Sequence, residues 1–432
     1  MGTTAFARGA LLLVLVIVSV LSSPPVQAEE RTLPLSQIIE YSLQNNGGLK
    51  SFREQKGIRD AGKTRAGLLP NPSIEFEGST GALTGNSAEN NLSLGISQEF
   101  LLSGKRNKRL AVAERELEMY NWQLSDRERL LRDEVKSAFY DLILTEKRLA
   151  FSENFISINR QLLDVTRERL AAGDISELEM NLVKVELARS LGKRLEVERV
   201  LKQNRAKLHE LMGLQPGEST KITGTLEQEI LVTRSLADLK QLAHANRPDI
   251  KALQAEKNRG EADIMLAGAE GIPNLTVGLA VMRETTAIEI GGMENKDTAY
   301  TVGLKLSLPI PVFDRNQAGV RESQARRNSA GSRLSAIAGT VDREVETAYA
   351  SFVNADTVLT MYRANILPQL EENLKLTQEA YRLGELGILA VIEEQKKFFE
   401  VNEGHLTALH ERLATLSRLE SATATDLSGG AQ

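Results

Sequence analysis

Four short stretches of the chain alternate apolar with small or polar residues, which is the pattern of a β-strand with one apolar face. They lie near residues 72–79, 90–101, 274–283 and 299–310. Their apolar positions are Ile74, Phe76, Leu92, Leu94, Ile96, Leu275, Val277, Leu279, Val302, Leu304 and Leu306. Each stretch is about ten residues long, the length that a tilted strand needs to cross a bilayer. Polar tips at 79–90 and 283–299 join the strands in pairs, and the second tip is expected to be a larger loop.

After each strand pair the pattern changes to a heptad repeat, which predicts long coiled-coil helices. Residues 105–172 contain neither Gly nor Pro, so one helix would run for about 100 Å at 1.5 Å per residue. A second helix of matching length starts near residue 316 and should be kinked by Pro368. Both helices turn at a glycine and run back through 177–212 and 389–420, which predicts two antiparallel helical hairpins.

The same order of elements occurs twice along the chain, which indicates an internal duplication. Segment 35–55 matches segment 236–256, and the strands and helical turns follow in the same order. We therefore predict a first structural repeat over 29–235, with the hairpin 105–212. The second repeat covers 236–420, with the hairpin 316–420. A flexible tail of small polar residues, 421–432, would follow.

Residues 1–28 have the pattern of a cleaved secretory signal peptide, with Arg8, an apolar run over 10–21 and a V-x-A end at Ala28. An uncleaved anchor helix is the alternative, although the apolar run is short for a membrane span. No Cys follows the signal, so we expect no lipid at the mature N-terminus. No later segment approaches twenty consecutive apolar residues, which leaves a soluble chain or a membrane β-barrel.

Composition and charge narrow the function. The chain is 26% charged and 4% aromatic, which is typical of long exposed helices, and its net charge of -5 argues against nucleic-acid binding. The absence of Cys excludes thiol chemistry. The four histidines are scattered, and His405 and His410 do not share a helical face. With no P-loop, GxSxG or HExxH motif, we expect neither an enzyme nor a cofactor or metal site.

Four strands are too few to close a barrel, but three copies of the chain would supply twelve. Each edge strand would then pair with a neighbouring protomer, and the apolar face would touch lipid. A soluble four-stranded sheet packed on a helix is one alternative, but it leaves the long hairpins without a role. A soluble coiled-coil scaffold is another, but it does not explain the strands.

The mature sequence resembles the TolC-like outer-membrane efflux protein family along essentially its whole length. The matching motifs are LPNPSIEFEG (69–78), SQEFLLSGKR (97–106), NRPDI (246–250), LSLPIPVFDRNQ (306–317), ILPQLEENL (366–374) and YRLGELG (381–387). Three of them look most like the heavy-metal (cobalt–zinc–cadmium) branch. The resemblance implies a mainly helical homotrimer with a small β part. Its twelve strands would form one outer-membrane barrel, and its coiled-coil hairpins would form an α-barrel tunnel across the periplasm.

The resemblance also implies a function and partners. The chain would be the passive outer-membrane channel of a tripartite efflux system, working with a periplasmic adaptor (membrane fusion) protein and an RND-type inner-membrane pump. Heavy-metal cations are the expected cargo, while drugs, other small molecules or type I protein secretion remain alternatives. A soluble periplasmic adaptor or scaffold remains the alternative class. Lys105, Arg106 and Arg315, next to the strand ends, would lie near lipid head groups or be ordinary solvated charges.

Two groups of residues near the helical turns are candidate sites. The resemblance implies that the turns dock on the adaptor through Arg169, Leu170, Gly173, Arg382, Leu383, Gly384 and Glu385. An exposed Leu beside Arg and Gly would form an apolar anchor, whereas the alternative is an ordinary left-handed helix end. It also implies that acidic residues beyond the turns line the tunnel mouth, namely Glu177, Glu179, Glu393 and Glu394. Threefold symmetry would make rings of carboxylates that attract cations, and solvated helix charges are the alternative.

Overall fold

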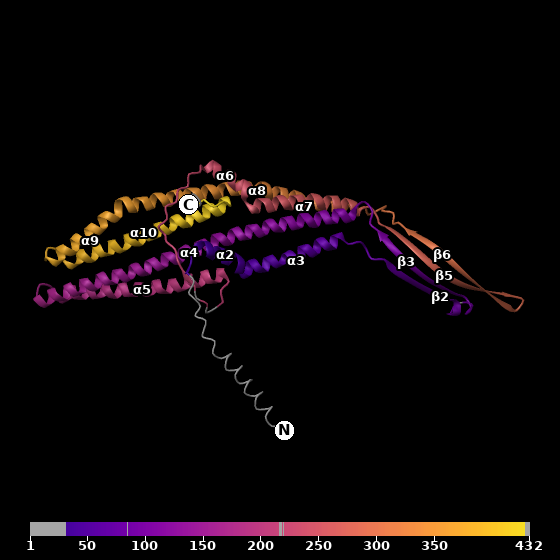
Figure 1. Ribbon diagram of the computed structural model, residues 1–432, viewed down its shortest axis with the longest axis horizontal. Helices are drawn as coiled ribbons and strands as arrows, with labels where there is room; N and C mark the ends of the chain where they lie inside the picture. Colours follow the sequence, from indigo (N-terminus) through magenta and orange to yellow (C-terminus); the bar gives the residue numbers. More distant parts are fainter. Residues whose placement is uncertain (1–31, 84, 216–217, 219, 428–432) are drawn as a thin grey trace, which may run out of the picture.

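The structure is a computed structural model that describes residues 32–83, 85–215, 218 and 220–427. The molecule is elongated, with a small sheet projecting from one end of a long helical body (Figure 1). The predicted signal peptide lies outside the described residues. Within the described ranges, no helix combines the length and the apolar character that a membrane crossing requires.

The helical body is built from two long antiparallel hairpins (Figure 1). In the first, α4 (Lys105–Ala172) packs against α5 (Glu177–Met212). In the second, α8 (Gln317–Met361), a π turn η2 (Tyr362–Ile366) and α9 (Leu367–Arg382) form one arm, and α10 (Ile388–Thr423) forms the other. The 68 residues of α4 form an uninterrupted helix because no Gly or Pro breaks them, as the sequence predicts.

The irregularity in the second hairpin lies one turn before the predicted position. The helical hydrogen-bond pattern changes over Tyr362–Ile366, while Pro368 lies in the first turn of α9, where its missing N–H is not needed. Tyr362 packs against α10 at Gly404, where any Cβ would collide with the tyrosine hydroxyl. The glycine of the facing helix therefore leaves room for the π turn.

Two pairs of shorter helices lie beside the hairpins: α2 (Leu35–Asn45) with α3 (Gly47–Gly67), and α6 (Leu236–Asn246) with α7 (Pro248–Glu270). Residues at corresponding positions of the two predicted repeats, Asn46 and Arg247, hold the two helix pairs in place. Asn46 caps the start of α3 and donates to the Leu211 carbonyl at the end of α5, 3.0 Å away. Arg247, which is 4% exposed, precedes α7 and donates to the Ala422 carbonyl near the end of α10 at 3.3 Å.

The segment between α5 and α6 is fixed to the second hairpin by a buried arginine. Arg412 of α10 donates to the carbonyls of Gln228 and Ile230, each at 2.7 Å, and pairs with Asp356 at 2.5 Å. A short parallel pairing of β1 (Thr32–Leu33) with β4 (Lys221–Ile222) lies in the same region. The main apolar core, which includes Val135, Leu142, Leu208 and Leu413, fills the middle of the molecule.

The sheet has the antiparallel order β2-β3-β5-β6, with β2 at Ser73–Thr80, β3 at Asn90–Phe100, β5 at Leu275–Ile290 and β6 at Met293–Ser307. A short 3₁₀ turn, η1 (Gly81–Leu83), follows β2. The predicted loop over 283–299 is wrong, because β5 and β6 continue through it as a ribbon. Gly291 and Gly292 close the ribbon with φ of 65° and 85°, values that suit a two-residue hairpin turn.

The C-terminal end of α10 differs from the predicted tail. The helix continues to Thr423, which is fully buried. Beyond it, the Thr425 hydroxyl accepts a hydrogen bond from Asn246 at 3.0 Å, and the Leu427 N–H donates to Glu420 at 2.9 Å. Residues 421–427 are therefore part of the packed helical body.

Candidate functional site

The turns of the two hairpins lie side by side at the end of the molecule opposite the sheet (Figure 1). Gly173 and Gly384 close them with nearly equal φ values of 81° and 83°. The Gly173 and Gly384 N–H groups donate to the Leu170 and Tyr381 carbonyls, each at 3.0 Å. These are left-handed helix ends for which glycine is the unstrained residue, so the shape of the turns needs no partner to explain it.

Arg169 joins the two turns. Its Nη1 donates to the Tyr381 carbonyl oxygen at 2.9 Å, and its guanidinium carbon lies 4.7 Å from the centre of the Tyr381 ring. Tyr381 is 1% exposed, and its hydroxyl lies 3.3 Å from the Thr166 hydroxyl. Arg169, predicted to face an adaptor, therefore contacts the other hairpin of its own chain.

A small apolar cluster lies just behind the turns and is separate from the main core. It contains residues from both hairpins, namely Leu162, Val183, Tyr381, Ile388, Val391 and Ile392. The Arg169–Tyr381 contact covers this cluster at the end of the molecule. The two tips are thus held together by apolar packing, by the Arg169 contact with Tyr381, by the hydroxyl pair Thr166–Tyr381 and by the ion pair Lys396–Glu186 at 3.5 Å.

The leucines that are exposed at the tips are only partly those that were predicted. Leu383 is exposed, as predicted, but Leu170 is only half-exposed. Leu178, Leu386 and Leu389 are exposed as well, and the sequence analysis missed them. Arg382 and Glu385 are also exposed, and Arg382 pairs with Glu379 at 2.6 Å. Heptad spacing shows that a leucine lies on an apolar stripe, but it does not show whether that stripe is covered within the same chain.

The four acidic candidates have different surroundings. Glu177 and Glu393 are exposed, whereas Glu179 is half-buried in the first turn of α5. The Glu394 side chain is 15% exposed and lies 3.6 Å from Lys397. Of the four candidates, Glu177 and Glu393 are therefore the ones whose carboxylates face solvent.

At the opposite end, all eleven apolar strand positions named in the sequence analysis lie on one face of the sheet. Cross-strand pairing puts Ile74, Ile96, Leu279 and Leu304 in one row, and Phe76, Leu94, Val281 and Val302 in the next. These side chains are largely exposed. The apolar face runs along β3 from Leu92 to Phe100, about 26 Å at 3.3 Å per residue.

The other face of the sheet is polar and has a floor of small residues. Glu75, Gly95, Ala280 and Gly303 form one row. The Ser97 hydroxyl donates to Glu75 at 2.8 Å, and the Lys305 ammonium reaches Glu75 at 3.5 Å from the far edge of the sheet. The absence of bulky side chains in the row allows this contact across the sheet.

The charges at the junction of sheet and helices are engaged within the protein. Lys105 is 4% exposed, and its ammonium donates to the Asn274 side chain at 2.6 Å. Burial lowers the pKa of Lys105 below its usual value. Arg106 donates to the Gly67 carbonyl at 2.6 Å, and Arg315 donates to the Pro311 carbonyl at 3.2 Å. The prediction that Lys105 meets lipid head groups is wrong, because the chain folds Asn274 over it.

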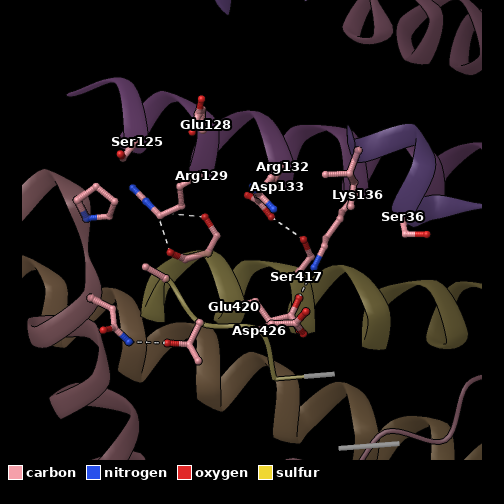
Figure 2. A pocket seen from close by; sticks show the side chains of 16 residues that line it. Ser36, Ser125, Glu128, Arg129, Arg132, Asp133, Lys136, Ser417, Glu420 and Asp426 are labelled. Atoms are coloured by element: carbon pink, nitrogen blue, oxygen red, sulfur yellow. Dashed lines mark hydrogen bonds and ion pairs between the residues drawn. The ribbon is translucent and has the colours of Figure 1, made fainter. Parts of the chain in front are cut away.

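A cavity of about 480 Å³ lies at the middle of the molecule, between α2, α4, the start of α7 and the end of α10 (Figure 2). Two polar contacts cross it: Lys136 contacts Glu420 at 2.6 Å, and the Ser417 hydroxyl donates to Asp133 at 2.7 Å. These contacts hold α10 on α4. Within the described residues, no group of three or more His, Cys, Asp or Glu side chains is placed to hold a metal ion.

The chain belongs to the outer membrane efflux protein family, whose sequence model matches residues 45–214 and 239–425. It is 23% identical over 405 residues to the cobalt-zinc-cadmium resistance protein CzcC of Cupriavidus metallidurans, covering 92% of this chain and 93% of that protein. It is 24% identical over 282 residues to the nickel-cobalt-cadmium resistance protein NccC of Alcaligenes xylosoxydans xylosoxydans, covering 64% of this chain and 60% of that protein.

The fold is also that of solved outer-membrane channels. A crystal structure of CusC, which was studied for the conformational changes of folding and transmembrane channel formation, matches with a TM-score of 0.75 at 17% identity. The match covers 91% of this chain and 92% of CusC. The predicted family and the mainly helical architecture with a small antiparallel sheet are therefore confirmed.

Proposed function

We propose that this chain is one protomer of a homotrimeric channel in the outer membrane of a Gram-negative bacterium, extending into the periplasm. The observation that carries the proposal is the exposed apolar face of the sheet, which is about as tall as the apolar band of an outer-membrane barrel, about 25 Å. The polar face with Glu75 and Lys305 would line the lumen. Lipid would cover the apolar face.

The two edges of the sheet support closure by neighbouring copies. β2 and β6 each pair on one side only within the described residues. A long exposed edge strand with an apolar face would aggregate in water unless it is paired. Three copies joined edge to edge would make a twelve-stranded barrel without edges.

Exposed apolar residues on the hairpins support a tunnel built from several protomers. Leu178 and Val185 lie seven residues apart on α5 and are both exposed, and Leu376 is exposed on α9. Stripes with this spacing suit packing against further helices in a coiled-coil manner. In the trimer they would meet neighbouring hairpins and form the α-barrel.

The channel would conduct passively and take its energy from partners, because the chain has no ATPase motif. We propose that the tips dock on a periplasmic adaptor, which joins the channel to an RND-type inner-membrane pump. The exposed Leu383 and its neighbours Arg382 and Glu385 suit such a contact. The shape of the tips would be set by the two turn glycines, Gly173 and Gly384, and by Arg169 and Leu170 next to the first turn.

Heavy-metal cations are the proposed cargo. The resistance proteins CzcC and NccC, whose names refer to cobalt, zinc, nickel and cadmium, support this assignment. Exposed Glu177 and Glu393, repeated by threefold symmetry, would attract cations to the periplasmic mouth. Deleting the gene should lower the metal concentration that stops growth; an unchanged metal tolerance with increased drug sensitivity would favour the small-molecule alternative.

We also propose that the chain arose by duplication and is exported by a cleaved signal peptide without lipid attachment. The match of the family model to two successive segments and the equivalent positions of Asn46 and Arg247 support the duplication. Residues 1–28 carry the signal pattern, and no Cys is present.

The first experiment is a native mass measurement on protein extracted from the outer-membrane fraction in mild detergent. A mass of three chains is the expected result and would support barrel closure. A soluble monomer or dimer that is absent from the membrane would overturn the channel proposal and favour a periplasmic scaffold.

A further inference from the structure

The β5–β6 hairpin extends well beyond the rest of the sheet. The first residue of β3, Asn90, pairs with Thr285 of β5. From Thr286–Asp297 to the turn, β5 and β6 pair only with each other in the described part of the chain. We call residues 286–297 the ribbon; it projects past the ends of β2 and β3 (Figure 1).

The exposed apolar residues of the ribbon lie on the side opposite to the apolar side of the sheet, and Asn295, which pairs with Ile288, lies on that side too. In the sheet, Leu279 and Val281 lie on the apolar face, and Ala280 lies on the polar face with Glu75. Alternation along β5 places Ile288 on that polar face, and the ribbon pairing places Met293 there as well. Ile288 is 60% exposed and Met293 is 78% exposed. Lys296, which pairs with Ala287, is on the other side.

A ribbon of this kind needs a partner. A two-stranded hairpin is marginally stable at best in water, and Ile288 and Met293 remain uncovered in the single chain. In the proposed barrel, the face of Glu75 points to the channel axis, and the ribbon projects on the side away from the helices. The groups available to cover Ile288 and Met293 on the axis are the same residues of the other two copies.

We propose that the ribbons of three protomers converge over the outer mouth of the channel and pack Ile288 and Met293 against one another on its axis. This inference rests on the proposed trimeric barrel. Ile288 and Met293 of one chain are thus covered by the ribbons of the second and third copies of this chain. The resulting apolar constriction would oppose the passage of ions, because a narrow apolar pore loses its water.

The dimensions allow this contact. Twelve strands about 4.8 Å apart and tilted by about 40° make a barrel with a radius of about 12 Å. The ribbon has five residue pairs, from Thr286–Asp297 to Ile290–Met293. At 3.3 Å per pair they reach about 17 Å, and the Gly291–Gly292 turn adds more. A ribbon bent inward therefore reaches the axis.

The base of the ribbon is firmly held, so the bend would occur next to it. Thr285, which pairs with both Asn90 and Thr298, is 7% exposed, and its hydroxyl lies 3.3 Å from that of Thr298. Beyond this row the third strand ends. Two-stranded ribbons twist more strongly than wider sheets, which suits an inward turn at this point.

The absence of native Cys makes a cross-linking test clean. The Met293→Cys variant is oxidised with copper phenanthroline in outer-membrane vesicles and run on a non-reducing gel. We expect a disulfide-linked dimer in at most about two thirds of the chains, because three cysteines at one axis can form a single disulfide. Lys296→Cys, on the other face, is the control and should stay monomeric while reacting with an impermeant maleimide on intact cells.

A conductance measurement gives an independent readout. The Ile288→Asp/Met293→Asp double variant should at least double the single-channel conductance. The carboxylates would repel one another, hold the three ribbons apart and keep the pore hydrated. The Lys296→Asp variant should leave it unchanged. Equal cross-linking of Met293→Cys and Lys296→Cys, or no cross-linking of either, would overturn the inference, as would an unchanged conductance of the double variant.

The native mass separates this inference from the proposed function. A trimer in the outer membrane whose Met293→Cys variant does not cross-link would refute the constriction and leave the channel intact. Absence of a trimer would refute both.

Discussion

Arg169 and Tyr381 lie 212 residues apart in the sequence, yet the arginine donates to the tyrosine carbonyl at 2.9 Å and stacks on its ring. Each residue belongs to a different hairpin, so the contact adds to the apolar packing that joins the two tips. A cation–π contact is worth about 0.5–2 kcal/mol, and a hydrogen bond adds about 1 kcal/mol. This contact alone is weak enough for a partner to break, while the apolar cluster behind the turns keeps the hairpins packed.

Arg169→Ala should loosen the tips without unfolding the chain. We expect a higher single-channel conductance and faster hydrogen exchange at residues around Tyr381. Arg167→Ala is the matched control, because Arg167 is exposed and pairs only with Asp164 of its own helix in the described contacts. Equal exchange rates in the two variants would show that the Arg169 contact does not hold the tips.

Leu94→Arg with Leu304→Arg should prevent insertion into the outer membrane. Both residues are exposed on the apolar face, and an arginine deep in the bilayer costs about 2–4 kcal/mol. Ser93→Arg with Thr301→Arg, on the polar face, is the control and should insert. The amount of each variant in the outer-membrane fraction decides the question; normal assembly of the Leu94/Leu304 variant would show that this face does not meet lipid.

Gly173→Asp with Gly384→Asp should weaken adaptor recruitment while trimers still form. Both glycines have positive φ, so any side chain costs about 1 kcal/mol at each turn and alters the tip surface. Gly192→Asp is the control, because Gly192 lies inside α5 with open space beside it. Cross-linking to the adaptor in cells is the measurement, and the same yield in all variants would place docking elsewhere.

Glu177→Gln with Glu393→Gln should lower the preference of the channel for cations. Both carboxylates face solvent at the tip end, whereas Glu394 is covered and close to Lys397. Glu394→Gln should therefore change ion selectivity little. Reversal potentials in a salt gradient report the difference, and a larger effect of Glu394→Gln would contradict the assignment of the mouth.

His405 should make the fold less stable in weak acid. Burial, with a smaller contribution from Arg363, lowers its pKa below the usual value, while Glu227 acts in the opposite direction. A lowered pKa means that the folded state favours the neutral ring. Stability is therefore full above the unfolded pKa of about 6.5 and is lost as the pH falls through the folded value.

The measurement for His405 is the thermal midpoint between pH 7.5 and pH 5. His405→Gln should lose part of the decline seen in the parent protein. His244→Gln is the control, because His244 is exposed and paired with Asp342 at 2.9 Å. A parallel decline in His405→Gln and the parent would exclude His405 as the source.

The ribbon shows where sequence patterns are insufficient. Residues 283–299 contain polar residues and two glycines, a composition that predicts a loop. In the structure they form paired strands, because a Gly-Gly turn lets the two segments satisfy each other's backbone groups. Alternation is weak evidence when both faces of a strand are solvent-exposed.

The amino-acid sequence is sufficient to predict the elements that depend on neighbours in the chain. Unbroken heptads specified the length of α4, glycines marked both turns, and a period of two put Ile74 and Leu304 on one face. Packing of the folded chain was needed to show that Arg169 stacks on Tyr381, that Lys105 is buried under Asn274 and that Glu394 is covered. Periodicity indicates which side of an element is apolar, whereas these contacts depend on how segments far apart in the sequence pack together.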